Sequence, residues 1–488
     1  MRHTVEVLIV GSGFSGLGMG VALRRAGITD FVILEKADDV GGVWRDNTYP
    51  GCECDVPAHL YSFSFAPNPG WSKTFAPQEE IRRYLRSVAD DYGLTGRIRF
   101  GTAMAGERWD ADEQRWQVTT DTGVEYAARF VVNSTRALFV PMLARLKGLR
   151  AFAGQTFHSA EWNHGIDLAG KRVAVIGTGA SAVQIVPAIA PRVASLTVFQ
   201  RSPAWVLTKP QRRAPGWLKL LFGAVPPVQR AVRAAQYWSR ETTGVPMMRM
   251  NRLVLARGER LGRRHIARQV SDHRLREKLT PDYRFGCKRV LLSNDYYPAL
   301  GRDNVALVTD GIDKVLPHAL VDGTGAEHPV DTIIFATGFQ GALQKVKIIG
   351  EGGRSLWRDW VRHGPQALRG VAVAGYPNLF FLHGPNSGSA HNSMVFMIEA
   401  QTRFVVRAIE HVRDAGAAGI GVRQQAQDAF QQRIQSALTD SVWVRGGCSS
   451  WYLDEHGVNR TMWPGASWRY RLETRTVHPG EFDLIRRK

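Results

Sequence analysis

Two glycine turns, each between a buried strand and the start of a helix, constrain this chain more than any other feature. The first reads Gly11-Ser-Gly-Phe-Ser-Gly16 and follows the apolar run Val5–Val10. The second reads Gly177-Thr-Gly-Ala-Ser-Ala182 and follows Val173–Ile176. Glycines in this context let a pyrophosphate approach the backbone and the helix start closely. The sequence therefore predicts two dinucleotide sites, joined by the stretch between them.

The residues around the first turn follow the order of a nucleotide-binding unit. A helix is predicted over Leu17–Ala26, ended by Gly27, and a second strand over Phe31–Glu35. Glu35 lies about two dozen residues after the first glycine, where a carboxylate is expected on the ribose. Because a carboxylate repels a 2′-phosphate, this site suits FAD or NAD better than NADP. The turn itself is assigned to Gly11, Gly13 and Gly16.

The second turn has a basic setting instead of an acidic one. Its following strand, Leu196–Phe199, runs into Gln200, Arg201 and Ser202 and carries no acid. A guanidinium beside a hydroxyl is suited to a 2′-phosphate, so the second nucleotide is predicted to be NADPH. Lys288 and Arg289 are further candidates for binding its phosphates.

The order of strands and helices predicts an α/β fold with two Rossmann-like dinucleotide-binding domains, one for FAD and one for NADPH. Residues 1–148 are assigned to the first part of the FAD domain and residues 149–340 to the NADPH domain. Residues 341–488 are predicted to complete the FAD domain. Residues 205–280 have the pattern of arginine-rich helices broken by prolines, a helical insertion expected to cover the active site. Residues 98–109 and 116–132 alternate as strands and predict a small antiparallel piece.

The net charge of +19 is concentrated between Lys209 and Arg289. The region has no zinc finger, RNA-recognition signature or other nucleic-acid motif, so nucleic acid is not an expected partner. Two interpretations stay open for this basic insertion: a solvated face, or peripheral contact with an anionic membrane. The oligomeric state is not predicted.

Three further features concern compartment and metal. No apolar run reaches the roughly 18 residues that cross a membrane, and the N-terminus enters a strand at once, which leaves no room for a signal peptide. The 4 cysteines make no disulfide framework, so a reducing cytoplasm is expected, with membrane association as the alternative. Cys52 and Cys54 have no partner pair at zinc-like spacing, and no metal site is predicted.

One motif between the two turns identifies a family. Phe152-x-Gly154-x-x-x-His158-x-x-x-Trp162 resembles the fingerprint of the Baeyer–Villiger monooxygenases, a branch of the class B flavoprotein monooxygenases. The resemblance extends over nearly the whole chain. Its other landmarks stand in the family's order: Gly41-Gly-Val-Trp44, Tyr49-Pro-Gly51, Cys54-Asp55, Tyr61-Ser-Phe63, Gln200-Arg-Ser-Pro203, Lys288-Arg289, Ala336-Thr-Gly338 and Ser450-Trp451.

The resemblance implies contacts with both cofactors. FAD would contact Ser15, Glu35, Val43, Trp44, Asp46, Asp55, Tyr61 and Met104. NADPH would contact Gly177, Thr178, Gly179, Ala180, Ser181, Ala182, Gln184, Arg201, Ser202, Lys288 and Arg289, with Trp451 near its nicotinamide end.

The resemblance also implies a reaction. NADPH reduces FAD, O2 forms a flavin C4a-peroxide, and attack on the carbonyl of an apolar ketone gives an ester or lactone. A developing oxyanion needs a fixed positive charge in a dry pocket. Arg289 is the candidate catalytic cation, because arginine keeps its charge when desolvated, and Asp55 would orient it. Met394 would line the substrate pocket.

Two positions depart from the family pattern. The fingerprint usually ends in proline or aspartate, whereas this chain has Asn163, and a junction that commonly reads Ala-Thr-Gly is here Ser134-Thr-Arg136. His158 and Trp162 are expected to touch no substrate and to set how the NADPH domain moves against the FAD domain.

Two other functions are weighed against ketone oxygenation. The first keeps the cofactors and oxidises a sulfide or an amine, which would make Arg289 less important. The second is a flavin-binding protein without turnover, which the presence of Arg201, Lys288, Arg289 and Asp55 argues against.

Overall fold

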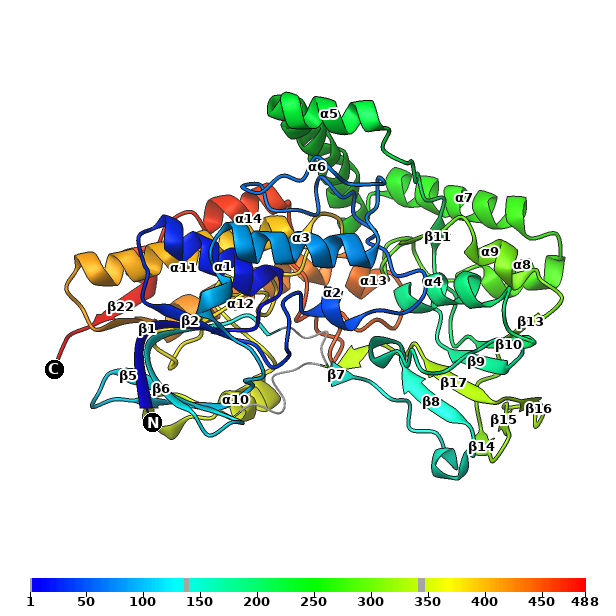
Figure 1. The fold of residues 1–488 in the computed structure, drawn as a ribbon, viewed down its shortest axis with the longest axis horizontal. Coiled ribbons are helices and arrows are strands. Elements are labelled where there is room, and N and C mark those ends of the chain that lie inside the picture. Colours follow the sequence, from blue (N-terminus) through cyan, green and yellow to red (C-terminus); the bar gives the residue numbers. More distant parts are fainter. Residues whose placement is uncertain (1, 136–139, 341–346) are drawn as a thin grey trace.

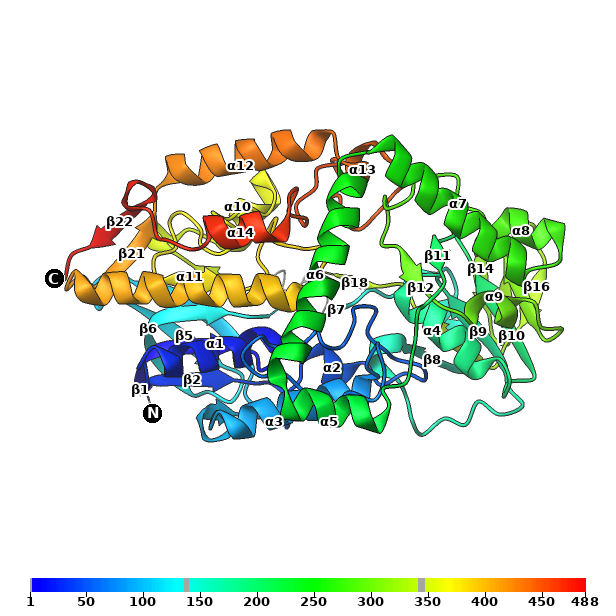
Figure 2. The same ribbon diagram turned by 90° about the horizontal axis from the view of Figure 1, so that it is seen from above.

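The computed structural model describes residues 2–135, 140–340 and 347–488. Arg136, the departure noted at the domain junction, lies outside these ranges. Within them the chain forms two sheets side by side, with a long helical segment running between the parts (Figures 1 and 2). The predicted α/β architecture with two Rossmann-like units is confirmed by both sheets.

The first sheet is built from both ends of the chain. Its order is β19-β4-β5-β6-β1-β2-β3, with β20 also paired to β6. The strands are β1 (Arg2–Val10), β2 (Phe31–Leu34), β3 (Ile98–Arg99), β4 (Met104–Asp110), β5 (Arg115–Thr120), β6 (Glu125–Asn133), β19 (Lys347–Ile349) and β20 (Leu379–Phe381). The antiparallel strands β4, β5 and β6 are therefore no separate piece, because β6 runs parallel to β1 and continues the main sheet. The C-terminal strand β20 pairs in parallel with the end of β6, so residues from both ends of the chain share this sheet.

Helices cover the first sheet on one face and a tryptophan-rich cluster fills the other. The glycine-containing helix α1 (Phe14–Arg25) packs against α11 (Met394–Asp414) and α3 (Gln78–Asp91). The opposite face buries Trp109, Trp116 and Tyr376. The remaining C-terminal elements are β21 (Gly419–Val422) paired with β22 (Phe482–Ile485), and helices α10 (Leu356–His363), α12 (Gln424–Thr439), α13 (Val442–Arg445) and α14 (Ser467–Glu473).

The second sheet is wholly parallel, in the order β13-β10-β9-β17-β8. Helices α4 and α9 pack together beside it, and a small antiparallel sheet of β14, β15 and β16 adjoins it. The elements are β8 (Gln155–His158), β9 (Arg172–Ile176), α4 (Ala180–Ile189), β10 (Ser195–Phe199), α9 (Tyr296–Leu300), β13 (Val305–Val308), β14 (Lys314–Leu316), β15 (Ala319–Val321), β16 (Glu327–Pro329) and β17 (Thr332–Phe335).

The arginine-rich insertion is helical, as predicted. Its helices are α5 (Gly216–Ala224), α6 (Pro226–Met248), α7 (Arg252–Gln269) and α8 (His273–Leu279), flanked by the paired strands β11 (Val206–Leu207) and β12 (Leu291–Leu292). Pro226 opens α6, where proline's fixed φ favours a helix start. Helix α6 runs across the molecule from α5 to α13, so the insertion contacts the C-terminal part (Figure 2).

Two links and one disulfide tie the two sheets together. The chain passes between them at β7 (Val140–Pro141) and β18 (Phe339–Gln340), which pair antiparallel. Cys287 and Cys448 form a disulfide, with their Cα atoms 6.1 Å apart. The sequence predicted no disulfide framework and gave no sign of this single pair, because 161 residues separate the two cysteines and only the fold brings them together. Cys52 and Cys54 are free thiols.

The structure leaves the predicted boundaries at residues 148 and 340 as predictions. It does show that residues on both sides of these positions belong to different sheets. No helix in the described ranges is long and apolar enough to cross a membrane.

Candidate active site at the junction of two dinucleotide folds

The first glycine turn leaves β1 at the carboxyl edge of the sheet. Val10 lies opposite Leu34, and the Gly11 N–H donates to the Leu34 carbonyl at 2.7 Å. Gly11 has φ +95°, and a Cβ on Gly16 would lie 1.8 Å from the Gly11 oxygen. Only glycine fits either position. Helix α1 then begins at Phe14, and its N-cap residue Gly13 leaves the first N–H groups without a side-chain cap, the arrangement that suits a phosphate.

Glu35 lies at this edge with its carboxylate fully engaged. One oxygen accepts from the N–H and hydroxyl of Ser12 at 2.9 and 2.6 Å. The other accepts from the Ala37 N–H at 3.1 Å and the Arg45 guanidinium at 2.9 Å. Since a carboxylate offers about four acceptor positions, a ribose hydroxyl would replace one of these donors. Sequence reasoning missed Arg45, although it directly follows the Gly-Gly-Val-Trp landmark.

Aromatic side chains gather beside the turn. Val43, Trp44 and Asp46 lie on the short helix α2 (Val43–Asp46). The Trp44 indole N–H donates to the Tyr61 hydroxyl at 3.1 Å, and their rings meet edge to face. Phe14 packs on the same tyrosine at a centroid distance of 5.1 Å. This wall is suited to a flat ring system.

Met104 has a different setting from the other predicted FAD contacts. It opens β4, and its side chain is buried in the apolar cluster that includes Val10, Leu34 and Val118. Packing of the first sheet explains this methionine without a ligand.

The second glycine turn repeats the geometry of the first. The Gly177 N–H donates to the Phe199 carbonyl at 3.0 Å, and a Cβ at this φ of +115° would lie 2.5 Å from the Ala336 oxygen. Nothing lies within 4 Å of a Cβ built on Gly179. Helix α4 starts at Ala180, and no side chain caps its first N–H groups, the arrangement that suits a phosphate.

Basic and hydroxyl side chains meet at the end of β10. The Lys288 ammonium donates to the Ser202 hydroxyl at 2.6 Å, and the Thr178 hydroxyl donates to the Ser202 carbonyl at 3.0 Å. Burial, and then the charge of Arg201, lower the pKa of Lys288. Arg201 itself is exposed. Arg201, Ser202 and Lys288, which were predicted to bind phosphates of NADPH, therefore lie together.

Gln184 of α4 holds the two sheets together instead of facing open space. Its amide oxygen accepts from the Tyr49 hydroxyl at 3.1 Å and from the Glu53 N–H at 3.3 Å, while its amide nitrogen donates to the Glu53 carbonyl at 2.9 Å. A Cβ on Gly51 would lie 2.7 Å from the Gln184 carbonyl oxygen. The Tyr-Pro-Gly landmark is thus a contact surface between the two halves.

Asp55 and Arg289 form the charged centre of the junction. The guanidinium donates from Nε and Nη2 to the two carboxylate oxygens, each at 2.6 Å. The Asp55 and Arg289 side chains are 24% and 37% exposed. Burial opposes ionisation of Asp55, but the charge and hydrogen bonds of Arg289 outweigh it and hold the pKa of Asp55 below its usual value. Asp55 in turn raises the pKa of Arg289, so both groups stay ionised.

Arg240 of α6 is a third member of this centre that sequence reasoning assigned only to the basic insertion. Its guanidinium donates to the Asp55 main-chain carbonyl at 3.1 Å. Burial lowers its pKa, while the charge of Asp55 acts in the opposite direction. One carboxylate and two guanidiniums give the cluster a net charge of about +1, which is the sign an oxyanion needs.

The loop around Trp451 reaches the same place from the C-terminal part. Trp451 is 53% exposed and its ring lies 4.8 Å from that of Tyr452. Tyr452 is buried, and burial raises its pKa to about 12, while the charge of Arg289 acts in the opposite direction. The disulfide fixes this loop to the segment that carries Lys288 and Arg289.

The fingerprint residues lie beside the links between the sheets. His158 is fully buried at the end of β8, with its ring 5.3 Å from that of Phe339 in β18. Trp162 packs edge to face on Phe157. The Asn163 side-chain oxygen accepts from the Gly165 N–H at 2.9 Å, a local turn that an aspartate would form equally well. These contacts of His158, Trp162 and Asn163 involve neither Asp55 nor Arg289.

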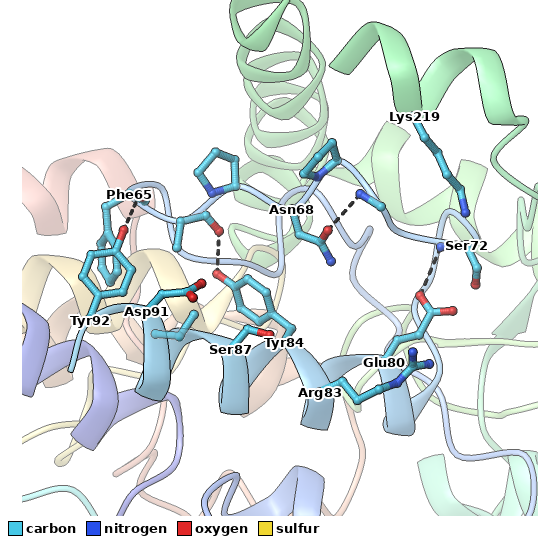
Figure 3. Close-up of a pocket in the computed structure, with 15 residues that line it drawn as sticks. Phe65, Asn68, Ser72, Glu80, Arg83, Tyr84, Ser87, Asp91, Tyr92 and Lys219 are labelled. Atoms are coloured by element: carbon cyan, nitrogen blue, oxygen red, sulfur yellow. Dashed lines mark hydrogen bonds between the residues drawn. The ribbon is translucent and has the colours of Figure 1, made fainter. Parts of the chain in front are cut away.

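A surface cavity of about 830 Å³ lies outside this site. It is formed by the loop 65–72, helix α3 and Lys219 of α5 (Figure 3). Glu80, Arg83 and Asp91 make its lining charged, and no predicted site residue contributes to it. Met394, predicted to line a substrate pocket, is the first residue of α11, and its sulfur accepts from the Ser389 N–H at 3.0 Å.

Two sheets that each carry a glycine turn, with an Asp55–Arg289 ion pair between the two parts of the chain, define the class: a protein with two dinucleotide-binding folds. Comparisons with known proteins narrow this class. The family model described as "Flavin-binding monooxygenase-like" matches residues 4–222. A Baeyer-Villiger monooxygenase of Streptomyces coelicolor is 44% identical, covering 100% of this chain and 94% of that protein. A Baeyer-Villiger monooxygenase of Pseudomonas aeruginosa is also 44% identical, covering 99% of this chain and 92% of that protein.

Solved structures agree with the sequence relatives. A closed crystal structure of cyclohexanone monooxygenase matches with a TM-score of 0.89 at 27% identity, covering 100% of both chains. Oxidised steroid monooxygenase bound to NADP matches with a TM-score of 0.88 at 31% identity, covering 99% of this chain and 100% of that one. The chain therefore belongs to the Baeyer–Villiger monooxygenase family of flavoproteins.

Proposed function

We propose that this protein uses FAD, NADPH and O2 to convert an apolar ketone into an ester or lactone. The observation that carries the proposal is the Asp55–Arg289 pair, in which residues 234 apart in sequence meet between the two glycine turns. Family membership supports the same reaction. The balance is one ketone, O2, NADPH and H⁺ giving one ester, water and NADP⁺.

The residues present fit both cofactors. Each turn has a glycine with a positive φ at the end of its first strand and an uncapped helix start, which is a cradle for a pyrophosphate. Glu35 offers a carboxylate at one turn, and Arg201 with Lys288 offers cations at the other. We therefore assign FAD to the first turn and NADPH to the second. Bound FAD supplies the site for electron uptake from NADPH and for activation of O2.

Arg289 supplies the fixed charge beside the reacting carbonyl. Asp55 binds the Nε–Nη2 edge of the guanidinium and so leaves the Nη1 edge outside this fork. Arg240 adds a second positive charge against the same aspartate. The centre can then stabilise a developing oxyanion, an effect typically worth about 3 kcal/mol for a single donor.

Replacement of Arg289 by alanine tests this assignment. We expect ester formation to fall by at least about 100-fold, while NADPH still bleaches the bound FAD under anaerobic conditions, although with a weaker affinity. Arg284→Ala is the matched control, because Arg284 lies on the same segment and pairs with Glu259. Undiminished ester formation by the Arg289 variant would show that the proposed role is wrong.

Oxidation of a sulfide is the alternative outcome of the same assay. It needs an electrophilic oxygen and no oxyanion stabilisation, so a sulfoxide as the main product, insensitive to Arg289→Ala, would favour that reaction. A panel of ketones and sulfides with NADPH and O2 distinguishes the two.

A further inference from the structure

The outer surface of helices α5 and α6 is apolar although it faces solvent. On α5, Trp217 and Leu220 are 66% and 76% exposed and stand three residues apart, on one side of the helix. The exposed residues of α6 continue the surface at helical spacing: Pro227, Ala231, Ala234, Ala235 and Trp238. We call these seven residues the insertion face. Both helices stand at the top of the molecule in Figure 1, and nothing covers them in Figure 2.

The inner surface of α6 combines core residues such as Tyr237 and Met248 with polar side chains that a surface helix usually keeps outside. Gln229 is buried and donates to the Asn68 carbonyl at 2.7 Å. Arg233 donates to the His59 and Ser62 carbonyls at 2.7 and 2.8 Å. Glu241 is buried against the C-terminal part. Three polar side chains of α6 thus lie on its inner side, whereas alanines and a tryptophan of the same helix face solvent.

Positive charge predominates around the insertion face, although α3 places Glu80 and Asp91 in the cavity that it shares with Lys219 of α5. Residues 211–240 contain no aspartate or glutamate. Arg212, Arg213 and Arg230 are exposed at its margins. Helix α7, on the same side of the molecule, adds further exposed arginines: Arg257, Arg260, Arg263, Arg264 and Arg268. A partner for this surface must combine an apolar interior with a negatively charged boundary.

We propose that the insertion face binds peripherally to the surface of an anionic lipid bilayer. Trp217 and Leu220 would enter the boundary between headgroups and acyl chains, and the surrounding arginines would contact lipid phosphates. A second copy of the chain fits less well, because a symmetric contact would place arginines opposite arginines. The proposal stands whether or not the protein oxygenates a ketone.

Vesicle sedimentation of the FAD-loaded full chain tests this. The probes are phosphatidylcholine vesicles with and without about one third phosphatidylglycerol, at low and high salt. We expect binding to the anionic vesicles only, weakened by salt, because charges near the surface are screened. The double variant Trp217→Ala/Leu220→Ser should bind at least about tenfold less tightly, since it loses most of the inserted apolar area.

A matched control lies on the opposite side of the molecule. Trp357 and Val361 of α10 are 40% and 63% exposed, one helical turn apart. Trp357→Ala/Val361→Ser should leave vesicle binding unchanged. A triple change of Arg212, Arg213 and Arg230 to glutamine should remove the preference for anionic lipid.

Three results would overturn the proposal. They are absence of wild-type binding to anionic vesicles, equal binding by the Trp217→Ala/Leu220→Ser variant, or equal binding to neutral and anionic lipid. If the wild type instead self-associates in analytical ultracentrifugation and the same variant is monomeric, the insertion face is an interface between copies and the lipid assignment is wrong.

Discussion

At the scale of single residues, the proposed second nucleotide site depends on two cations, of which Lys288 also lies within the electrostatic influence of Asp282. Arg201 is exposed, and Lys288 is held against Ser202 with a lowered pKa. A 2′-phosphate would satisfy both and favour the charged form of the lysine. This gives the cofactor preference a physical origin in two side chains rather than in the turn itself.

Arg201→Ala is expected to raise the KM for NADPH about tenfold and to leave the KM for NADH unchanged, because one charge-assisted contact to the 2′-phosphate is lost. Steady-state kinetics with both nucleotides measure this. Arg192→Ala is the control, since Arg192 is 65% exposed in the same unit and pairs with Asp167. If the NADPH preference survives in the Arg201 variant, the assignment of the 2′-phosphate to this residue is incorrect.

Glu107 is a buried carboxyl that the proposed reaction does not use. It is 3% exposed on β4, and neither oxygen has a hydrogen-bond partner among the described residues. Burial raises its pKa to about 8 from the ordinary 4.5. The pKa of Glu107 is higher in the folded state than in the unfolded state. Its contribution to the free energy of unfolding is therefore complete below pH 4.5 and is lost as pH rises through about 8.

Glu107→Met should therefore stabilise the protein at pH 8, by on the order of 3 kcal/mol relative to pH 5. Urea unfolding of the variant and the wild type at both pH values measures the difference. Glu125→Met on β6, where the side chain is exposed, should show no such pH dependence. Parallel pH profiles for wild type and Glu107→Met would mean that the carboxyl titrates normally.

At the scale of elements, α6 joins parts of the chain that are distant in sequence. Its Arg240 reaches the Asp55 carbonyl, and the next residue, Glu241, is buried against the C-terminal part. Glu241 accepts from the Ser467 hydroxyl, from Asn392 at 2.8 Å and from His391 at 3.1 Å. Burial opposes its ionisation, but its bonds with His391 and the charge of that ring outweigh burial and lower the pKa of Glu241. The buried carboxylate thus positions the helix that carries Arg240.

Glu241→Gln should lower the stability of this region by about 3 kcal/mol, because donors on Ser467 and Asn392 lose a charged acceptor. Hydrogen exchange of α6 and the urea midpoint report the effect, with exposed Glu79→Gln as the control. The pKa of Glu241 is lower in the folded state than in the unfolded state. Its contribution to stability is therefore present above the unfolded pKa of about 4.3 and is lost as pH falls through the folded pKa. An unchanged exchange rate in α6 at neutral pH would contradict the positioning role.

At the scale of the whole molecule, local patterns were predictable and contacts across the molecule were not. Both turns follow from their own strands and glycines, and the pairing of Val10 with Leu34 places Gly11 and Glu35 at one edge as expected. Asp55 and Arg289 were paired only through the family resemblance. Their hydrogen bonds depend on how the two sheets pack, which no local periodicity encodes.

The features that the sequence analysis missed also depend on contacts between residues far apart in the sequence. Arg240 was grouped with surface charge, because helical spacing does not say which face of α6 crosses to Asp55. The disulfide was not predicted, because 161 residues separate Cys287 from Cys448. Met104 was assigned to the cofactor by resemblance, and this assignment stays a prediction; the structure shows that its side chain is buried in the core. Tertiary packing decides the role of a residue wherever its local pattern allows several roles.

Product analysis with ¹⁸O2 tests the central claim most directly. The FAD-loaded protein is supplied with NADPH, an apolar cyclic ketone and ¹⁸O2, and the product is examined by mass spectrometry. We expect a lactone with one ¹⁸O atom and one NADPH consumed per lactone formed. NADPH oxidation that yields only hydrogen peroxide, or a ketone recovered unchanged across the panel while sulfides are oxidised, would contradict it.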